Sequence, residues 1–343
     1  MSSWCRIPGR RTRASVVGLL AGMLSVGLTA CGTVQDSSQQ PGVAPGGGAF
    51  PVTITHKFGS TTIPAPPHRV VVLGGSSATD AVLALGVTPV AVSKDTTTSN
   101  GISPWLAGKL DPTKTQLIDT DVTVNAEQIA QLHPDLILAI GLYTLEQNYS
   151  TLSQIAPTIG YQSEWGKQSW DQVVQVVGQA LGKQAAADRL IADTQAKIAA
   201  VKTDYPGLAG KTFSASAANV PGKVFTLVSP DDFAVKLFGQ LGLRLTPSLA
   251  GVTGVGGNPR AGLGYEQLDK LNADLVVLAF LTPDMQQAVE GSPLYQNMPA
   301  VRDGRVTVVD MTAITQLANP SVLGIPWLLD KLRPGLEKAS IAS

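Results

Sequence analysis

Apolar runs and amphipathic segments alternate along most of this 343-residue chain. Residues 52–58 and 61–63 alternate between apolar and polar positions on either side of Gly59-Ser60, which predicts a β-hairpin. Unbroken apolar runs of strand length follow, as is typical of strands buried on both faces. The predicted strands of this half are residues 69–73, 87–93 and 135–140. Helical spacing predicts helices at residues 78–85, 123–132 and 152–155. This order of strands and helices predicts a parallel sheet flanked by helices.

A long helical pattern occupies the middle of the chain. From Trp170 to about Lys202, apolar residues recur every three or four positions. Gly182 is expected to divide the segment, and Tyr205-Pro206-Gly207 to end it. The second helix, about residues 183–203, would be roughly 30 Å long at about 1.5 Å per residue. A single long helix between two sheet-containing halves predicts a rigid connection.

The second half repeats the alternation of the first. Strands are predicted at residues 212–217, 224–228, 274–279 and 306–309, and helices at 231–241, 293–296 and 320–337. The last helix is expected to be interrupted near Pro326. A glycine-rich tract at 251–264 is long for a compact domain, which predicts a binding loop or disorder. The chain is therefore expected to be an α/β protein with two Rossmann-like lobes joined by one long helix.

One phrase occurs twice. Residues 127–138 read EQIAQLHPDLIL and residues 266–277 read EQLDKLNADLVV, at a constant offset of 139 residues. Each copy has a glutamate in the first turn of a short helix, then a turn, then an apolar strand. The repeat predicts two lobes built alike, with Glu127 and Glu266 at equivalent places.

The first 30 residues have the pattern of a signal peptide. Four arginines precede an apolar stretch, residues 14–30, that is short for a spanning helix. It ends Leu-Thr-Ala-Cys, which resembles a bacterial lipobox with Cys31 as the lipidated residue. The alternatives are an ordinary secretory peptide and an uncleaved anchor. Residues 31–50 are rich in Gly, Pro, Ser and Gln and are expected to form a flexible tether.

Charge and cysteine content narrow the classes of function. The whole chain is balanced, with 25 basic and 25 acidic residues. Loss of the four signal-peptide arginines leaves the mature chain mildly acidic, which does not favour nucleic-acid binding. Cys5 belongs to the signal segment and Cys31 would carry lipid, so structural disulfides and catalytic thiolates are excluded. The histidines, His56, His68 and His133, are not expected to form a metal site.

Short stretches across nearly the whole mature chain resemble the bacterial substrate-binding proteins of iron-siderophore, haem and cobalamin importers. They are PPHRVVVLG (66–74), ALGVTPVAV (84–92), EQIAQLHPDLIL (127–138), IAPTI (155–159), LGKQAAADRLI (181–191), YEQLDKLNADLVVL (265–278) and SPLYQNMPAVRDGRVTVVD (292–310). The resemblance implies two lobes with a ligand held between them, no enzymatic activity, and delivery to an ABC permease with its ATPase. It also implies an extracytoplasmic, lipid-anchored protein, which we expect to act as a monomer.

The resemblance also gives the repeated glutamates a role. In this family a glutamate at the matching position of each lobe meets arginines of the permease, so Glu127 and Glu266 are predicted to dock there. Exposed carboxylates suit bidentate guanidinium contacts. The local alternative is that each glutamate complements the dipole of its own helix, for about 0.3–1 kcal/mol. Asp135 and Asp274, before each strand, are expected to be structural.

Candidate ligand residues follow from the rule that ligands bind beyond the carboxyl ends of parallel strands. The rule selects Ser76, Ser77, Lys94, Trp105, Tyr143, Trp165, Arg260 and Phe280. Aromatic faces with one or two cations suit a ferric siderophore, which is expected to arrive with its iron already chelated. No intrinsic cofactor is expected. The tryptophans could instead only cover loops, while Trp170 and Trp327 are expected to lie in the core.

Other functions remain open. Haem or cobalamin could replace the siderophore, and Tyr143 could ligate haem iron. A secreted α/β enzyme is disfavoured because the chain lacks a nucleophile elbow, a dinucleotide fingerprint and a P-loop. A surface protein that kept the fold and lost transport is a third class. The expected organisation is a signal peptide (1–30), a tether (31–50), a lobe (51–168), a helical connection (169–204) and a second lobe (205–343).

Overall fold

The structure is a computed structural model that describes residues 50–254 and 258–342. The signal peptide, Cys31, nearly all of the tether and residues 255–257 therefore lie outside the described residues. Residues 44–343 form one compact unit, which contains both sheets. Among the described residues, every helix is too short or too polar to cross a membrane.

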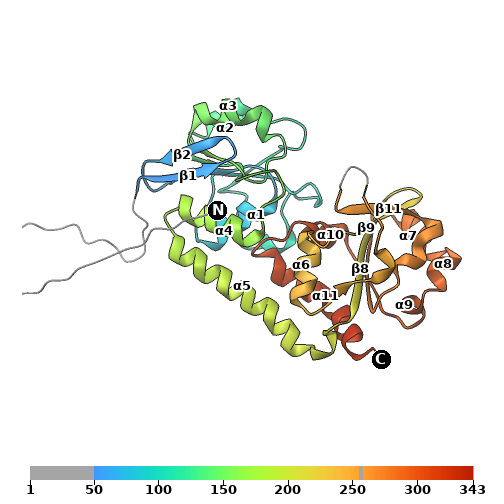
Figure 1. Ribbon diagram of the computed structural model, residues 1–343. Coiled ribbons are helices and arrows are strands. Elements are labelled where there is room, and N and C mark those ends of the chain that lie inside the picture. The colour runs from blue at the N-terminus through green and yellow to red at the C-terminus, as the bar shows by residue number, and fades with distance from the viewer. Residues whose placement is uncertain (1–49, 255–257, 343) are drawn as a thin grey trace, which may run out of the picture. The chain divides into compact units, whose positions relative to one another are not determined.

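The N-terminal lobe is built on a parallel five-stranded sheet. Its strand order is β5-β4-β3-β6-β7. A separate antiparallel hairpin, β1-β2, precedes it (Figure 1). The strands are β1 Val52–His56, β2 Gly59–Ile63, β3 Val70–Val72, β4 Ala91–Ser93, β5 Gln116–Ile118, β6 Leu136–Leu138 and β7 Thr158–Ile159. The helices are α1 Ser76–Ala84, α2 Ala126–Gln131 and α3 Leu145–Ile155, with a short 3-10 helix, η1, at Pro104–Leu106.

The predicted hairpin and parallel sheet are confirmed, with two differences in length. The strand expected over residues 87–93 is reduced to β4, because Gly86 (φ 74°) and the turn after it belong to the connection from α1. The helix expected at residues 152–155 is α3, which begins seven residues earlier at Leu145. Leu145 and Leu152 are the buried residues of α3, so few apolar positions marked its first turns.

The C-terminal lobe has a mixed sheet of order β11-β9-β8-β12-β13, with β10 paired to the start of β8. Its strands are β8 Thr212–Val220, β9 Lys223–Leu227, β10 Arg244–Leu245, β11 Arg260–Gly264, β12 Leu275–Phe280 and β13 Val306–Val309. Its helices are α6 Phe233–Gln240, α7 Pro283–Glu290, α8 Pro293–Gln296, α9 Pro299–Arg302, α10 Met311–Ala318 and α11 Gly324–Ile341. Three 3-10 helices complete it: η2 Pro206–Leu208, η3 Pro247–Leu249 and η5 Tyr265–Leu271.

Three expectations about this lobe were wrong in whole or in part. The glycine-rich tract ends in a strand, since β11 pairs antiparallel with β9 and closes one edge of the sheet. Three helices, α7, α9 and α10, were not predicted. The closing helix is not interrupted at Pro326, which lies in the first turn of α11, where a missing N–H costs little. The proline inside that helix is Pro334.

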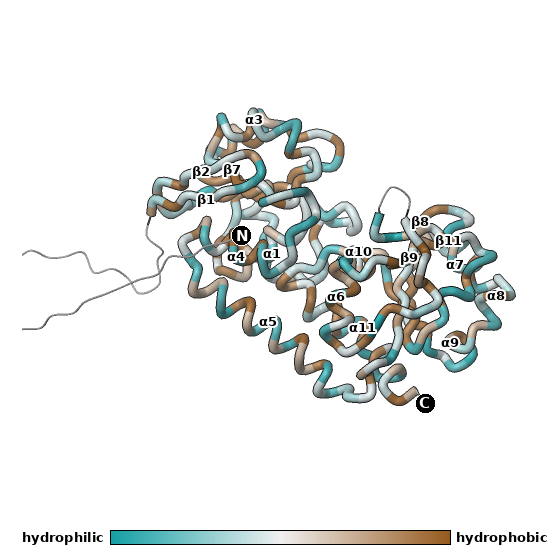
Figure 2. Tube along the Cα trace, in the orientation of Figure 1, coloured by the Kyte–Doolittle hydropathy of each residue, from teal (hydrophilic) through white to brown (hydrophobic). Residues whose placement is uncertain are grey.

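The connecting segment consists of α4 (Trp170–Ala180) and the 21-residue α5 (Gln184–Asp204), divided at Gly182 as expected. Gly182 has φ 66°, a conformation that favours glycine. The apolar side of α4 packs into the core of the N-terminal lobe. Along α5, Ala187 and Ile191 belong to that core, whereas Ile198 and Val201 belong to the core of the C-terminal lobe. Figure 2 shows hydrophobic and hydrophilic positions alternating along α5.

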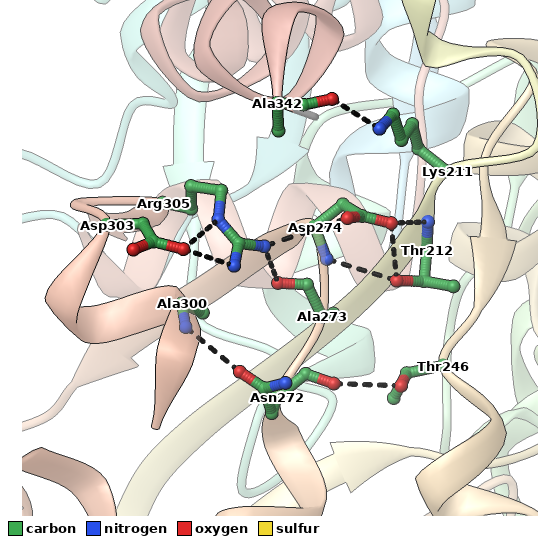
Figure 3. A network of polar contacts seen from close by, with 10 residues as sticks. All are labelled: Lys211, Thr212, Thr246, Asn272, Ala273, Asp274, Ala300, Asp303, Arg305 and Ala342. Carbon is green, nitrogen blue, oxygen red and sulfur yellow. Dashed lines mark hydrogen bonds and ion pairs between the residues drawn. The ribbon is translucent and has the colours of Figure 1, made fainter. Parts of the chain in front are cut away.

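The aspartates of the repeated phrase join neighbouring strands in the same way in both lobes. Asp135, before β6, accepts hydrogen bonds from the backbone N–H groups of His68 (2.7 Å) and Arg69 (2.8 Å). Asp274, before β12, accepts from the N–H of Thr212 (2.7 Å) and from its hydroxyl (2.8 Å). Figure 3 shows Asp274 between Thr212 and Arg305. Each carboxylate thus fixes the start of the adjacent parallel strand, which is the structural role expected from the sequence.

Candidate ligand-binding cleft

A cavity of about 540 Å³ lies where all five strands of the N-terminal sheet end. Residues one or two positions after the end of each strand line it, from Gly74 after β3 to Tyr161 after β7. The floor needs glycine because two strand ends approach each other closely. A Cβ on Gly74 (φ 77°) would lie 2.2 Å from the backbone nitrogen of Leu142. The parallel sheet therefore places its loops around one hollow, as the carboxyl-end rule predicts.

The C-terminal lobe supplies the opposite wall. Phe233 at the start of α6 and several residues of α10 and the segment after it line the same cavity. These are Thr312, Thr315, Gln316, Asn319 and Pro320. Asp310 follows β13 and caps α10 by accepting a hydrogen bond from the N–H of Ala313 at 2.7 Å. The cavity is therefore a cleft between two lobes.

A second cavity of about 350 Å³ extends the cleft into the C-terminal lobe. It lies against β8 and β9 and is lined by Asn219, Phe225, Asn258 and Arg260 among others. Thr315 of α10 and Asn319 after it line both cavities, so the two cavities adjoin at the end of α10.

Most of the predicted ligand residues lie in this cleft. Ser76, Ser77, Lys94, Trp105, Tyr143 and Trp165 line the larger cavity, and Arg260 lines the smaller one. Phe280 lines neither cavity and packs against the apolar cluster around β12. It stands at the end of β12 as predicted, but its ring turns into the core of its own lobe. We therefore leave Phe280 out of the candidate site.

Trp105 forms part of the cleft floor, and contacts with Asp80 and Trp327 fix its side chain. Its side chain is 8% exposed, and its Nε1 donates a 2.8 Å hydrogen bond to Oδ2 of Asp80 on α1. Its ring packs against Trp327 of α11 at 5.1 Å between centroids. Burial raises the pKa of Asp80 to about 7, although hydrogen bonds from Ser321 and Trp105 oppose the rise. Because its N–H is already used, Trp105 offers a ligand only the face or edge of its ring.

Tyr143 and Trp165 form an aromatic rim at the mouth of the cleft. They are 73% and 46% exposed, and their rings meet edge to face at 5.0 Å. Trp165 Nε1 donates to the carbonyl oxygen of Gly141 at 3.0 Å, which fixes its ring beside the end of β6. Exposed aromatic pairs of this kind suit contact with a large, partly apolar ligand.

The cations of the cleft are paired with carboxylates. Lys94 Nζ lies 2.6 Å from Oδ2 of Asp119, and this contact with Lys94 is the main cause of a lowered pKa for Asp119. Arg260 lies 3.7 Å from Oδ2 of the buried Asp232. Burial raises the pKa of Asp232, while the N–H of Ala234 and the charge of Arg260 counteract it. This partner of Arg260 could not be predicted from local sequence, because Asp232 is 28 residues away.

Several residues that line the larger cavity were not predicted from the sequence. These are Tyr161, Gln168 and Phe233, together with Thr312, Thr315 and Gln316 of α10. Application of the carboxyl-end rule to the predicted strand at 306–309 would have found α10. Trp170, expected in the core, packs against both lobes and also lines the cleft.

The repeated glutamates lie away from the cleft lining. Glu127 is exposed in the first turn of α2, which Asn125 caps by accepting a hydrogen bond from the N–H of Gln128. Glu266 is exposed in the first turn of η5, and its carboxylate folds back over Gly264, where a Cβ would lie 2.3 Å from Oε1. Both glutamates are therefore accessible from solvent at the start of their helices.

Clusters of side chains that could bind a metal ion are absent from the part of the chain that the structure describes. Within residues 50–254 and 258–342, no three His, Cys, Asp or Glu side chains gather as ligands for a metal ion. His56 is buried in the hairpin, where its Nε2 lies 2.9 Å from Thr61 Oγ1. His68 and His133 stand at the turns that precede β3 and β6.

Comparisons with known proteins agree on one group. The family described as periplasmic binding protein matches residues 70–313. YhfQ of Bacillus subtilis, named as an ABC transporter substrate-binding lipoprotein, is 28% identical, covering 84% of this chain and 89% of its own. The Fe(3+)-citrate-binding protein YfmC of the same bacterium is 26% identical, covering 75% and 78%.

Solved structures show the same similarity. A periplasmic solute binding protein of Mycobacterium smegmatis has a TM-score of 0.72 and 27% identity, over 84% of this chain and 98% of its own. PiaA of Streptococcus pneumoniae in complex with ferrichrome has a TM-score of 0.69 and 26% identity, over the same shares.

Proposed function

The chain belongs to the periplasmic binding protein family, and from this membership we propose that it captures a ferric siderophore outside the cytoplasm and delivers it to an ABC importer. The family resemblance found in the sequence is thereby confirmed. The permease and its ATPase would be its partners, and lipid on Cys31 would hold it at the membrane. Its relatives include a named lipoprotein, which supports that placement. Cys31 itself lies outside the described residues.

One observation carries the proposal. The 540 Å³ cavity is walled by all five strand ends of one lobe and by α10 of the other, so both lobes would touch a bound molecule. Its size lies within the range of about 300–1,000 Å³ that is usual for small-molecule sites. The aromatic rim of Tyr143 and Trp165 suits a bulky chelate, and no catalytic role is needed for any lining residue.

Two of the relatives support iron as the cargo. YfmC is named for ferric citrate, and PiaA was solved with ferrichrome. Haem is the second candidate, since the exposed hydroxyl of Tyr143 stands at the cleft mouth and could ligate haem iron. Cobalamin, carried by the same kind of importer, is the third.

A binding panel tests the proposal. The full chain, purified in detergent, is titrated with ferric chelates, haem and cyanocobalamin, while tryptophan fluorescence is followed. We expect a ferric chelate to quench the fluorescence at micromolar or lower concentration, because Trp165 and Trp105 line the cleft. The iron-free chelator is the matched control. Binding of haem or cyanocobalamin, with every ferric chelate inactive, would contradict the proposed cargo.

Native mass spectrometry gives an independent answer. Protein purified from iron-starved bacteria should carry a mass that matches a chelator plus iron. A bound mass that corresponds to haem would favour the second candidate.

A further inference from the structure

Charged side chains are few in the cleft, and those present are compensated. Lys94, Asp95 and Asp121 are the charged residues that line the larger cavity, and Arg260 is the one that lines the smaller. Asp119 and Asp232 pair with the two cations from beside the cavities. Residues 255–257, which are not described, are Val-Gly-Gly and add no charge. Two cations therefore face at least as many carboxylates.

The carboxylate of Asp95 is also satisfied within the protein. Its Oδ1 accepts hydrogen bonds from the N–H (2.9 Å) and hydroxyl (2.6 Å) of Thr97, and its Oδ2 accepts from the hydroxyl of Ser103 (2.5 Å). A ligand that carries several negative charges would meet this acid and Asp121 without a surplus of cations. Burial of uncompensated charge costs several kcal/mol, so such a ligand would bind weakly.

Apart from these charged groups, the wall of the larger cavity is a mixture of apolar residues and uncharged polar ones. Hydroxyl and amide side chains of both lobes line the larger cavity, including Ser76, Ser77, Thr315, Gln316 and Asn319. Such groups can donate hydrogen bonds to the carbonyl and N–O oxygens of a neutral hydroxamate chelate without leaving any charge unbalanced.

Further hydrogen-bonding capacity lies in the walls. Thr79 Oγ1, Thr144 Oγ1, Gln168 Nε2 and Ser216 Oγ have no hydrogen-bond partner among the described residues, and each belongs to a residue that lines the cleft. Each of these buried groups is uncharged and can donate a hydrogen bond. A rotation about χ1 turns a threonine or serine hydroxyl toward a ligand, so the walls can adapt to a neutral polar surface.

On these grounds, and resting on the proposed function, we propose that the cleft is selective for uncharged or singly cationic ferric chelates of the trihydroxamate class. In such a chelate, three hydroxamate anions neutralise Fe³⁺. Ferric dicitrate, which keeps negative charge on its carboxylates, is disfavoured because Lys94 and Arg260 are already paired with Asp119 and Asp232.

A charge series tests the selectivity. The full chain in detergent is titrated with ferric dicitrate (anionic), ferrichrome (neutral), ferrioxamine B (cationic), haem and cyanocobalamin. We expect ferrichrome or ferrioxamine B to bind at least 100-fold tighter than ferric dicitrate, a difference of about 2.7 kcal/mol. The dissociation constant of ferrichrome, which is neutral, should change less than twofold between 50 and 500 mM NaCl, because screening acts on charged pairs.

The outcomes separate this inference from the proposed function. Equal or tighter binding of ferric dicitrate overturns the charge selectivity and leaves the ferric-chelate function intact. Failure of every ferric chelate, with cyanocobalamin or haem bound instead, overturns both.

A gain-of-function variant tests the physical cause. Thr315 is exposed on α10 and lines both cavities, so Thr315→Lys places a new cation in the cleft without disturbing the core. Thr315→Gln is the matched uncharged control. Relative to Thr315→Gln, Thr315→Lys should bind ferric dicitrate at least tenfold tighter. An unchanged ratio between dicitrate and ferrichrome in the two variants would show that charge balance does not set the selectivity.

Discussion

Ser321, in the segment between α10 and α11, donates a hydrogen bond of 2.5 Å to Oδ2 of Asp80, which lies 241 residues earlier on α1. The Asp80 side chain is completely buried, and the same oxygen accepts from Trp105 Nε1 on the cleft floor. One carboxylate therefore joins a helix of the first lobe, the floor of the cleft and the beginning of α11. With α5, it forms a second link between the lobes.

Asp80 makes the stability of the protein depend on pH. Its ordinary pKa of 3.8 is raised to about 7 by burial, so the folded state holds a proton that the unfolded chain releases. Stability from this group is fully present below about pH 4 and is lost as the pH rises to about 7. Asp80→Asn keeps an oxygen acceptor and cannot ionise. When urea unfolding is measured at several pH values, the free energy of unfolding of this variant should vary less between pH 4 and 7 than that of the wild type.

Asp80→Ala is the contrasting variant. It leaves the N–H of Trp105 without its acceptor and opens space between the lobes, for which we expect a loss of about 2–4 kcal/mol in the free energy of unfolding. Identical pH profiles for the wild type and Asp80→Asn would exclude titration of this carboxyl as the cause.

The aromatic rim should contribute to ligand affinity. Tyr143→Ala or Trp165→Ala removes an exposed ring at the mouth of the cleft, and each is expected to weaken binding of a ferric chelate by roughly tenfold, or about 1.4 kcal/mol. Tyr143→Phe is the control, since it keeps the ring and removes the hydroxyl. Isothermal titration should give near wild-type affinity for Tyr143→Phe. Loss of haem binding in that variant alone would point to axial ligation.

The two glutamates are expected to act on transport and not on ligand binding. The double change Glu127→Ala, Glu266→Ala should lower uptake of ⁵⁵Fe chelate by cells at least tenfold, because two charge-assisted contacts with the permease are lost. The affinity of the purified variant for its ligand should stay within twofold of wild type. Glu337→Ala, at an exposed acid on α11, is the matched control. Normal uptake by the double variant would reject the docking role.

The lipid anchor is tested by Cys31→Ala. Without a thiol at this position no lipid can be attached, so the protein should move from the membrane fraction to the soluble or secreted fraction. Metabolic labelling with a radioactive fatty acid should mark the wild type alone. Unchanged fractionation would favour an uncleaved anchor.

Asp274 should matter for stability alone. Burial by itself would raise its pKa, but the N–H and hydroxyl of Thr212, with the charges of Lys211 and Arg305, lower it overall. The stability that it provides is therefore present above about pH 4 and is lost as the pH falls further. Asp274→Ala is expected to cost about 1–3 kcal/mol near neutral pH, with ligand affinity unchanged. Asp135→Ala, its equivalent in the other lobe, is the comparison, and a large loss of affinity in either variant would contradict a purely structural role.

Periodicity and local chemistry determined most of the elements. The hairpin, the buried strands β3 and β6 and the division at Gly182 follow from nearest neighbours in sequence, whose preferences need no distant partner. Even the lining of the cleft by Ser76, Lys94 and Tyr143 was predictable, because parallel strands must end at one edge. The repeated phrase likewise predicted equivalent places for Asp135 and Asp274.

Only the tertiary structure decided what depends on contacts between remote segments. The pairing of Arg260 with Asp232, the burial of Phe280 in its own lobe and the strand β11 all depend on packing across the second sheet. In the sequence, Asp80 looks like any polar residue of a helix. Only the fold brings Ser321 and Trp105 to its carboxylate. The net charge that the cleft presents depends on ion pairs of this kind. Sequence therefore specified which strand ends surround the cleft, and folding specified which charges remain unpaired there.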